Sequence, residues 1–390
     1  MIPVRLLVCL HCVAAAWMPT SAWAQQLSFT LTEEMLIGDD EDAPAEYLFT
    51  GPELVRTNSR GYIYVNDRRR ADVRVFDRSG RFITTIGKRG EGAGEMSEIV
   101  SMHIDGQDRL LVADRNSQRF TIFEDLGERF ETIAFPEEIW GAPHPILTVG
   151  DAFVLRYVRA LDDPSGKLPY IKDTKTLHLF DAALNHIETF ADLGDMFNLD
   201  VPLEKELSDN QGALNMATNG IDEIVLVPRV YRGYVYRFVL RADAWHMAEL
   251  RGGPVPRQSY RMVTKDEFDN DFELGRSSIL VAGPSGVYRA RVFNWSLGVA
   301  VLSTGEIVNF TLQTPLRGEL GHRAELFDAT GQLLGYGPIR FNDSALNRNE
   351  EIMSDFEILW VDQNDRIYLR RPNERGFYVL SVAELVIQPE

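Results

Sequence analysis

The stretch Gly61–Gly92, GYIYVNDRRRADVRVFDRSGRFITTIGKRGEG, carries the pattern that decides the fold. Residues 62–67, 73–76 and 81–86 alternate between apolar and polar side chains, and turn-forming residues separate them, which predicts three short strands. A further strand is predicted at 53–56, before this stretch. Together these segments predict one module of four strands, followed by a glycine-rich corner.

The same module recurs 47 residues later, with strands predicted at 100–104, 110–114, 120–123 and 129–133. The landmarks that share this offset are Asp67 and Asp114, Phe76 and Phe123, Gly80 and Gly127, and Ile86 and Ile133. All of them fall on strands or turns. Such agreement indicates an internal repeat.

Weaker copies follow along the chain. The third set is predicted at 147–149, 152–158, 176–180 and 186–190, and the fourth at 214–218, 221–227, 234–240 and 245–250. Residues 279–312 are strand-like without a clear register, residues 324–334 repeat the hairpin of the first module, and the last set lies at 357–361, 367–369 and 377–380. Four-stranded units of about 40–50 residues without long helices predict an all-β, six-bladed β-propeller. Seven blades is the alternative, because residues 251–323 have room for another.

These residues also resemble a known family. The motifs Gly-x-Ile-Tyr-Val-x-Asp at 61–67, Arg-Val-Phe-Asp-x-x-Gly at 74–80 and Ile-Gly-x-x-Gly-x-Gly-x-Gly-Glu at 86–95 resemble an NHL-type repeat. With the N-terminal segment described next, the chain is similar to secreted bacterial six-bladed β-propeller proteins. The resemblance covers residues 51–136 and returns at 324–334 and 357–369. It implies the fold and leaves the function open.

The N-terminal segment predicts export. Residues 1–24 combine the basic Arg5, an apolar run at 6–18 and the small-x-small sequence Ala22-Trp23-Ala24, as a secretory signal peptide does. We therefore expect a signal peptide at 1–24, an N-terminal strand with an acidic linker at 25–50, and the propeller at 51–390. The expected location is periplasmic or secreted. Both cysteines, Cys9 and Cys12, fall in the signal peptide, so no disulfide is expected.

Charge and hydropathy limit the partners. The formal net charge of −18 repels polyphosphate, so no nucleic acid is expected. After the signal peptide no segment is long and apolar enough to predict a membrane span. We expect a monomer.

The sequence contains no Gly-x-Ser-x-Gly or His-Glu-x-x-His motif and no phosphate-binding loop before a helix. The favoured function is therefore a binding or scaffolding module for a protein, peptide or glycan partner, without catalysis or a cofactor. The resemblance implies an alternative, because some NHL-like propellers are lyases or lactonase-like hydrolases with a metal in the central channel. His103 lies on a predicted inner strand and is the residue to test for that role. Asn215 lies on another and is a poor zinc ligand. A calcium or zinc ion in the channel stays open as part of this alternative.

A cluster of arginines is the second candidate for ligand binding. Arg68, Arg69 and Arg70 occupy a strand connection in the first module, and Arg115 and Asn116 occupy the equivalent connection in the second. On an acidic protein, a ring of arginines at this rim is suited to an anionic ligand such as an acidic glycan or a peptide carboxylate. The competing interpretation is a set of surface ion pairs with neighbouring Asp and Glu residues.

Overall fold

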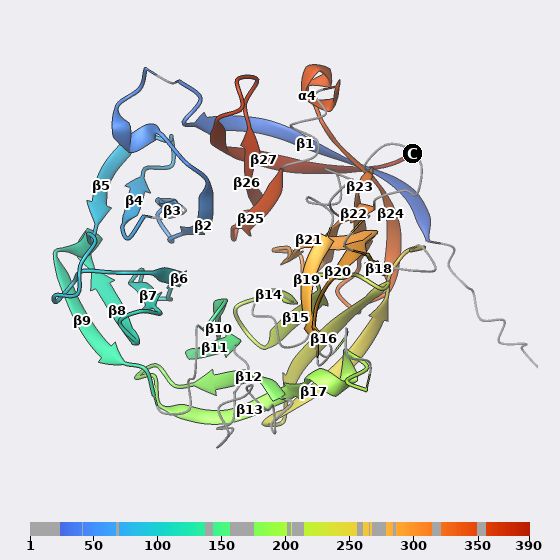
Figure 1. Cartoon of the computed structure of the whole chain (residues 1–390), viewed down its shortest axis with the longest axis horizontal. Coiled ribbons are helices and arrows are strands. Elements are labelled where there is room, and N and C mark those ends of the chain that lie inside the picture. Colours follow the sequence, from blue (N-terminus) through green and yellow to red (C-terminus); the bar gives the residue numbers. More distant parts are fainter. Residues whose placement is uncertain are drawn as a thin grey trace, which may run out of the picture.

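Four-stranded antiparallel sheets stand side by side in a ring in the computed structural model (Figure 1). The structure describes residues 24–40, 42–67, 70–136, 143–156, 175–200, 204, 214–255, 260–264, 266, 278–283, 286–313, 321–348 and 356–390. The predicted signal peptide lies outside these residues except for Ala24. The ring has six blades, which confirms the predicted fold class.

The blades follow one another along the chain, each built from the inner strand outwards. Blade 1 consists of β2 (Pro52–Thr57), β3 (Ile63–Asp67), β4 (Val73–Phe76) and β5 (Phe82–Ile86). Blade 2 consists of β6 (Ile99–Ile104), β7 (Leu110–Asp114), β8 (Arg119–Glu124) and β9 (Arg129–Ala134). Blade 3 consists of β10 (Ile146–Val149), β11 (Ala152–Arg156), β12 (Lys175–Phe180) and β13 (His186–Asp192). Blade 4 consists of β14 (Leu214–Thr218), β15 (Glu223–Pro228), β16 (Tyr234–Arg241) and β17 (Ala244–Arg251).

The last two blades share one continuous eight-stranded sheet. Blade 5 consists of β21 (Asn294–Val301), β22 (Ile307–Gln313), β23 (Gly321–Phe327) and β24 (Leu333–Phe341). Blade 6 consists of β25 (Glu357–Val361), β26 (Arg366–Pro372), β27 (Tyr378–Pro389) and, as its outermost strand, β1 (Gln25–Ile37). The first strand of the chain thus completes the last blade and closes the ring (Figure 1).

The closing strand β1 has two partners. It pairs antiparallel with β27, from Leu27 opposite Pro389 to Ile37 opposite Leu380, and parallel with β24, from Gln25 opposite Gly335 to Leu31 opposite Phe341. The sequence predicts this strand as part of a segment, residues 25–50, that precedes the propeller. In the structure, this strand lies within the sheet of blade 6.

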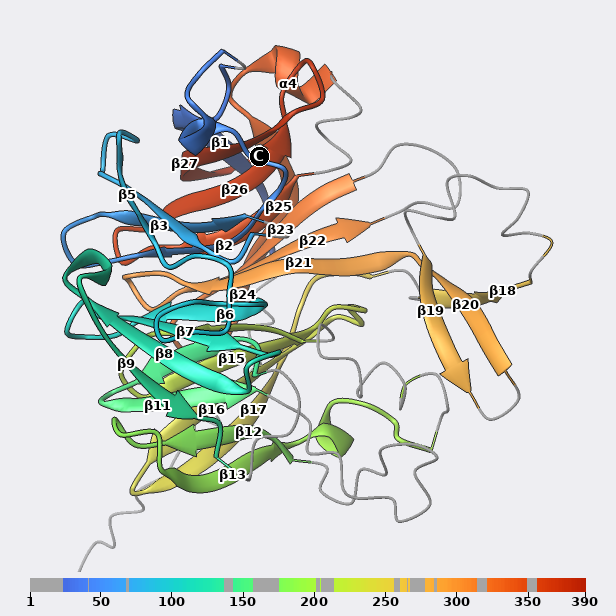
Figure 2. The same cartoon turned by 60° about the vertical axis from the view of Figure 1, so that its left-hand side comes forward.

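A small sheet interrupts the chain between blades 4 and 5. It consists of β18 (Tyr260–Val263), β19 (Ser278–Gly283) and β20 (Gly286–Val292), in the order β18-β20-β19. Figure 2 shows it standing away from the ring. The seven-bladed alternative is therefore wrong, because the additional strands in 251–323 form this separate sheet.

The core lies between neighbouring blades. Successive side chains of β7 point to opposite faces, so that Leu110 and Val112 pack with blade 1 while Leu111 and Ala113 pack with blade 3. Each blade buries both of its faces in this way, which a single four-stranded sheet is unable to do. Most of the alternating apolar residues of the repeat therefore stabilise the fold.

Hydrogen bonds also join neighbouring blades at their turns. Ser59 donates from its backbone N–H and its hydroxyl to Asp108 of the next blade, at 2.8 and 2.7 Å. Ser303 does the same to Asp365, at 2.7 and 2.6 Å. Both aspartates have a positive φ of 62°, and each stands before the arginine of a repeated Asp-Arg pair.

The two ends of the ring differ in the length of their connections. At one end, here called the short-turn end, every connection between strands has five residues or fewer, as at 58–62, 105–109 and 302–306. At the other, the long-loop end, the chain passes from β3 to β4, from β7 to β8 and from blade to blade. This end carries the long connections at 157–174, 193–213 and 252–293.

Helix is scarce in the described part of the chain. It includes the 3-10 turns Ala45–Tyr47, Asp125–Gly127 and Leu193–Asp195, and the short helix α4 (Ser344–Arg348). Within the residues that the structure describes, no helix has the length and apolar character to cross a membrane.

Candidate functional site

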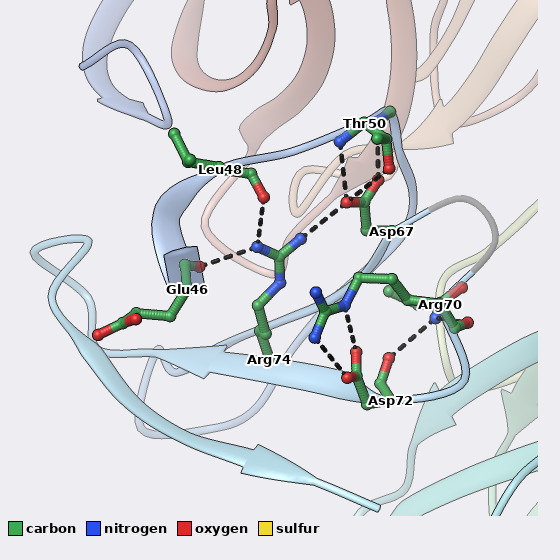
Figure 3. Close-up of polar contacts among 9 residues, drawn as sticks. Glu46, Leu48, Thr50, Asp67, Arg70, Asp72 and Arg74 are labelled. Carbon is green, nitrogen blue, oxygen red and sulfur yellow. Dashed lines mark hydrogen bonds and ion pairs between the residues drawn. The ribbon is translucent and has the colours of Figure 1, made fainter. Parts of the chain in front are cut away.

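Of the three consecutive arginines in the predicted rim, the structure describes Arg70, and Arg68 and Arg69 lie outside the described residues. Arg70 donates from Nε and Nη2 to the two carboxylate oxygens of Asp72, at 2.8 and 2.6 Å (Figure 3). This fork of two hydrogen bonds satisfies one edge of its guanidinium. The group lies at the long-loop end, in the connection from β3 to β4.

The next arginine in the sequence, Arg74, has a structural role. Its buried guanidinium donates to Asp67 at 3.0 Å and to the backbone carbonyls of Glu46 and Leu48 at 2.9 and 2.7 Å (Figure 3). Asp67 also accepts a hydrogen bond from the backbone N–H of Thr50 at 2.9 Å. This network fixes the segment that leads from the closing strand into blade 1.

Arg115 and Asn116 occupy the equivalent connection in blade 2. Arg115 donates from Nε to Glu98 at 2.9 Å and makes a second contact with the same carboxylate through Nη2. Asn116 donates to the hydroxyl of Ser97 at 3.4 Å. Arg70 and Arg115 thus each face a carboxylate of their own blade, the arrangement of surface ion pairs.

His103 lies at the centre of the ring, on the inner strand β6, as predicted. Its Nε2 and the hydroxyl of Thr148 in blade 3 form a hydrogen bond of 3.2 Å. The ring is buried and meets Phe153 edge-on, with centroids 6.4 Å apart. Burial, and next the charge of Arg56, lower the pKa of His103 to about 3, so its imidazole is neutral at neutral pH.

Arg56 is the neighbour of His103 at the same height. Each is the penultimate residue of its inner strand, and their numbers differ by the repeat offset. We call the six residues at this position the central level: Arg56, His103, Thr148, Ala217, Ala300 and Trp360. The guanidinium carbon of Arg56 lies 4.4 Å from the ring centre of Trp360, a cation–π contact.

A histidine and a second arginine lie near the central level, where the histidine interacts electrostatically with that arginine and with Arg56. His144, in the loop before β10, is buried, and its pKa is lowered to about 4 by burial and then by the charges of Arg156 and Arg56. Arg156, at the end of β11, is also buried, and burial lowers its pKa to about 10. Arg156 is therefore charged at neutral pH, whereas His144 is neutral.

Asn215 joins two inner strands. Its Nδ2 donates to the backbone carbonyl and the hydroxyl of Ser296 in blade 5, at 2.9 and 3.0 Å. The contact is to blade 5, whereas His103 bonds to blade 3. The structure thus places both residues on inner strands, as the sequence predicts, and gives them different partners.

A metal centre needs several ligands in one place. Among the residues that the structure describes, no group of three or more His, Cys, Asp or Glu side chains lies close enough together to hold a metal ion. The histidine pair His178 and His186, with ring centroids 5.7 Å apart, lies on the outer half of blade 3.

A cavity opens at the long-loop end, between blades 3 and 4. It has a volume of about 580 Å³ and is lined by segment 194–200, Arg232, Tyr234, Tyr236 and Glu249. Arg232 pairs with Glu204 at 2.7 Å and lies over the ring of Phe197. Two tyrosines beside paired charges make a wall that offers both apolar contact and hydrogen bonds to a ligand.

Sequence reasoning missed two parts of this site, Arg56 and the cavity. The signal for Arg56 was present, because 56 and 103 share the offset of 47 that relates the first two modules. The cavity had no comparable signal, since it is formed by a connection between blades that has no counterpart in the repeat.

Comparison with known proteins supports the fold. A family model described as a 6-bladed beta-propeller matches residues 43–138, which contain the two clearest modules. The crystal structure of a member of the DUF4221 family from Bacteroides vulgatus is similar to this chain, with a TM-score of 0.55 and 11% identity. The match covers 94% of this chain and 100% of that chain, and at this identity it shows a shared fold.

Other solved propellers are less similar. The WD40 repeats of RRP9 match with a TM-score of 0.45 and 11% identity, over 91% of this chain and 98% of that chain. Virginiamycin B lyase from Staphylococcus aureus matches with a TM-score of 0.40 and 8% identity, over 91% of this chain and 99% of that chain. Their TM-scores are too low for either likeness to bear on function. A search among curated proteins gives no match.

Proposed function

We propose that this chain is an extracytoplasmic binding or scaffolding module that holds a protein, peptide or glycan partner at its long-loop end. It acts as a monomer and without a cofactor. The observation that carries the proposal is the difference between the two ends. Every connection at the short-turn end has five residues or fewer, whereas the other end carries the connections 157–174, 193–213 and 252–293. Binding residues concentrate on such loops when a rigid scaffold positions them.

The cavity between blades 3 and 4 also supports the long-loop end as the binding end. Tyr234 begins β16, and Glu249 lies near the end of β17, which places the lining at the long-loop end. Tyr234 is partly exposed and Tyr236 is buried. Tyrosines of this kind give a large contact area with little loss of side-chain freedom on binding.

The proposed location rests on the sequence. Residues 1–24 have the pattern of a secretory signal peptide, and the chain after them contains no cysteine. The NHL-type character of the blades is likewise proposed from the motifs at 61–67, 74–80 and 86–95. Fractionation of the native host tests the location, with the protein expected outside the cytoplasm and shortened by the signal peptide.

Site-specific photocrosslinking tests the proposed binding end. The photoreactive residue p-benzoylphenylalanine replaces Tyr234, at the long-loop end, or Ile221, at the short-turn end of the same blade. Both positions are exposed, Tyr234 at 36% and Ile221 at 71%. Exposure alone would therefore favour an adduct at the control position, Ile221. In the native host we expect a covalent adduct from position 234 and none from position 221. An adduct from position 221 with none from position 234 would refute the proposal.

Metal analysis separates this function from the metal-dependent alternative. A lyase or hydrolase centred on His103 requires a stoichiometric ion in the purified protein, and loss of that ion in His103→Ala. The binding module requires neither. We expect protein purified without chelator to have the same melting temperature before and after chelator is added.

A further inference from the structure

One wall of the cavity between blades 3 and 4 is held in place by contacts within the protein. Glu204 accepts hydrogen bonds from the backbone N–H of Asn198 at 2.6 Å and from Nη1 of Arg232 at 2.7 Å. Arg232 also donates from Nη2 to the backbone carbonyl of Met196 and lies over the ring of Phe197. These contacts tie the lining segment to blade 4, and they engage the charge of Arg232 inside the wall.

Carboxylates dominate the charge of this cavity. Asp195, Asp200 and Glu249 line it, and within the described part of the chain none of them forms an ion pair. Arg251 follows Glu249 by two residues on β17 and is not part of the lining. Even with Arg251 and the ion pair of the wall included, four carboxylates face two guanidinium groups. The cavity therefore attracts a cation and repels an anion.

Two tyrosines on one face of β16 supply aromatic surface to the same cavity. Tyr234 is partly exposed and Tyr236 is 4% exposed, and both line the cavity. Tyr236 lies directly opposite Glu249 in the pair of β16 and β17, which brings its side chain beside a carboxylate. The hydroxyl of Tyr236 has no hydrogen-bond partner within the described part of the chain and is not sealed off from solvent. A polar group at such a place is available to a ligand.

A guanidinium group combines the contacts that these side chains offer. It is planar, so it stacks on a tyrosine ring, while its N–H groups donate to a carboxylate and to a neutral hydroxyl oxygen. An ammonium group has no flat face for stacking. The volume of about 580 Å³ lies within the range of about 300–1,000 Å³ that is typical of ligand pockets, so a long side chain fits.

We propose that this cavity binds an arginine side chain of the partner, with the guanidinium held by the carboxylate of Glu249 and by Tyr234 and Tyr236. The inference rests on the proposed function, because it names the part of the partner that enters the long-loop end. It favours a protein or peptide over a glycan as the partner.

Saturation-transfer NMR with N-acetyl-arginine methylamide as the probe tests this site on the full mature chain. We expect the wild-type protein to bind this probe, and to bind N-acetyl-citrulline methylamide at least tenfold more weakly, because citrulline has nearly the same shape and no charge. Glu249→Gln is expected to weaken binding of the arginine probe at least threefold. Glu131→Gln is the matched control, because Glu131 is an exposed carboxylate on the outermost strand of blade 2, and it is expected to bind as the wild type does.

Three results would overturn the inference. These are no saturation transfer to the arginine probe, equal binding of the citrulline probe, or equal affinity of Glu249→Gln and Glu131→Gln. The comparison of the two probes uses the wild-type protein, so it decides the matter even if Glu249→Gln fails to fold.

Photocrosslinking separates a failure of this inference from a failure of the proposed function. An adduct from position 234 without binding of the arginine probe overturns the arginine site and leaves the binding end in place. An adduct from position 221 with none from position 234 overturns the proposed function and the arginine site together.

Discussion

Burial of His103 at the centre of the ring makes the stability of the folded protein depend on pH. Its pKa is lowered from 6.5 to about 3, and that of His144 from 6.5 to about 4, with burial the largest cause in both. Below pH 6.5 the unfolded chain therefore binds protons that the folded chain does not. Acidification favours unfolding over this window, and the stability is fully retained above pH 6.5.

The substitution His103→Gln removes one of these buried imidazoles and keeps a group that hydrogen-bonds to Thr148. We expect the free energy of unfolding to fall less steeply between pH 6.5 and pH 4, by up to about 1.4 kcal/mol per pH unit. Urea unfolding across this range measures the slope. The control is His246→Gln, at an exposed position on β17, and it should keep the wild-type slope. An unchanged slope in His103→Gln would mean that this imidazole is not held neutral.

At the scale of single residues, the sequence predicted positions better than partners. His103 and Asn215 were both placed on inner strands, because alternation and turn residues locate strands. That Asn215 bonds to Ser296 and Arg70 to Asp72 depends on side-chain rotamers and on contacts between blades, which a strand pattern does not contain. Arg56 could have been found from the offset of 47 that it shares with His103, whereas its contact with Trp360 depends on how the blades meet in the folded ring.

At the scale of elements, the pairing of β1 with β24 depends on glycine. A Cβ atom at Gly337 would lie 1.5 Å from the backbone oxygen of Leu27, and one at Gly335 would lie 2.4 Å from that of Gln25. No side-chain rotation relieves a contact between a Cβ atom and backbone. These glycines therefore allow blades 5 and 6 to share one sheet.

We expect Gly337→Ala to separate β1 from β24 and to lower the free energy of unfolding by about 1–3 kcal/mol, in the range of overpacked sites. Denaturant unfolding gives the free energy, and amide hydrogen exchange in β1 shows where the structure loosens. Gly321→Ala in β23 is the control, since its Cβ would lie 3.6 Å from the backbone oxygen of Gln313, an ordinary contact. Equal stability of the two variants would contradict this account of the closure.

The elements that the sequence predicted best are those of the repeat. Blades 1 and 2 appear at the predicted strands because their landmarks recur at one offset. The place of β1 was missed for the opposite reason: an outermost strand taken from the start of the chain carries no module landmarks, and its partner lies more than 300 residues away. In the small sheet, the sequence predicted strands at the positions of β19 and β20 and none at that of β18. These three strands pair among themselves, and they therefore lie outside the ring.

At the scale of the whole molecule, the ring has two unlike ends and buried arginine and histidine side chains near its centre. The number of blades follows from the repeat, and the unlike ends follow from the length of the insertions at 157–174, 193–213 and 252–293. That these insertions share one end follows from the strand order of every blade. The identity of the partner follows neither from the repeat nor from the insertion lengths, because it depends on the surface that the loops form together.

The central claim is that this ring binds its partner through the long-loop end. The most direct measurement is amide hydrogen exchange on the mature chain, with and without the partner recovered by crosslinking. We expect slower exchange on binding in the connections 115–118, 229–233 and 373–377, and no change in the short turns 105–109, 219–222 and 302–306. Protection of the short turns, with the connections of the long-loop end unchanged, would contradict it.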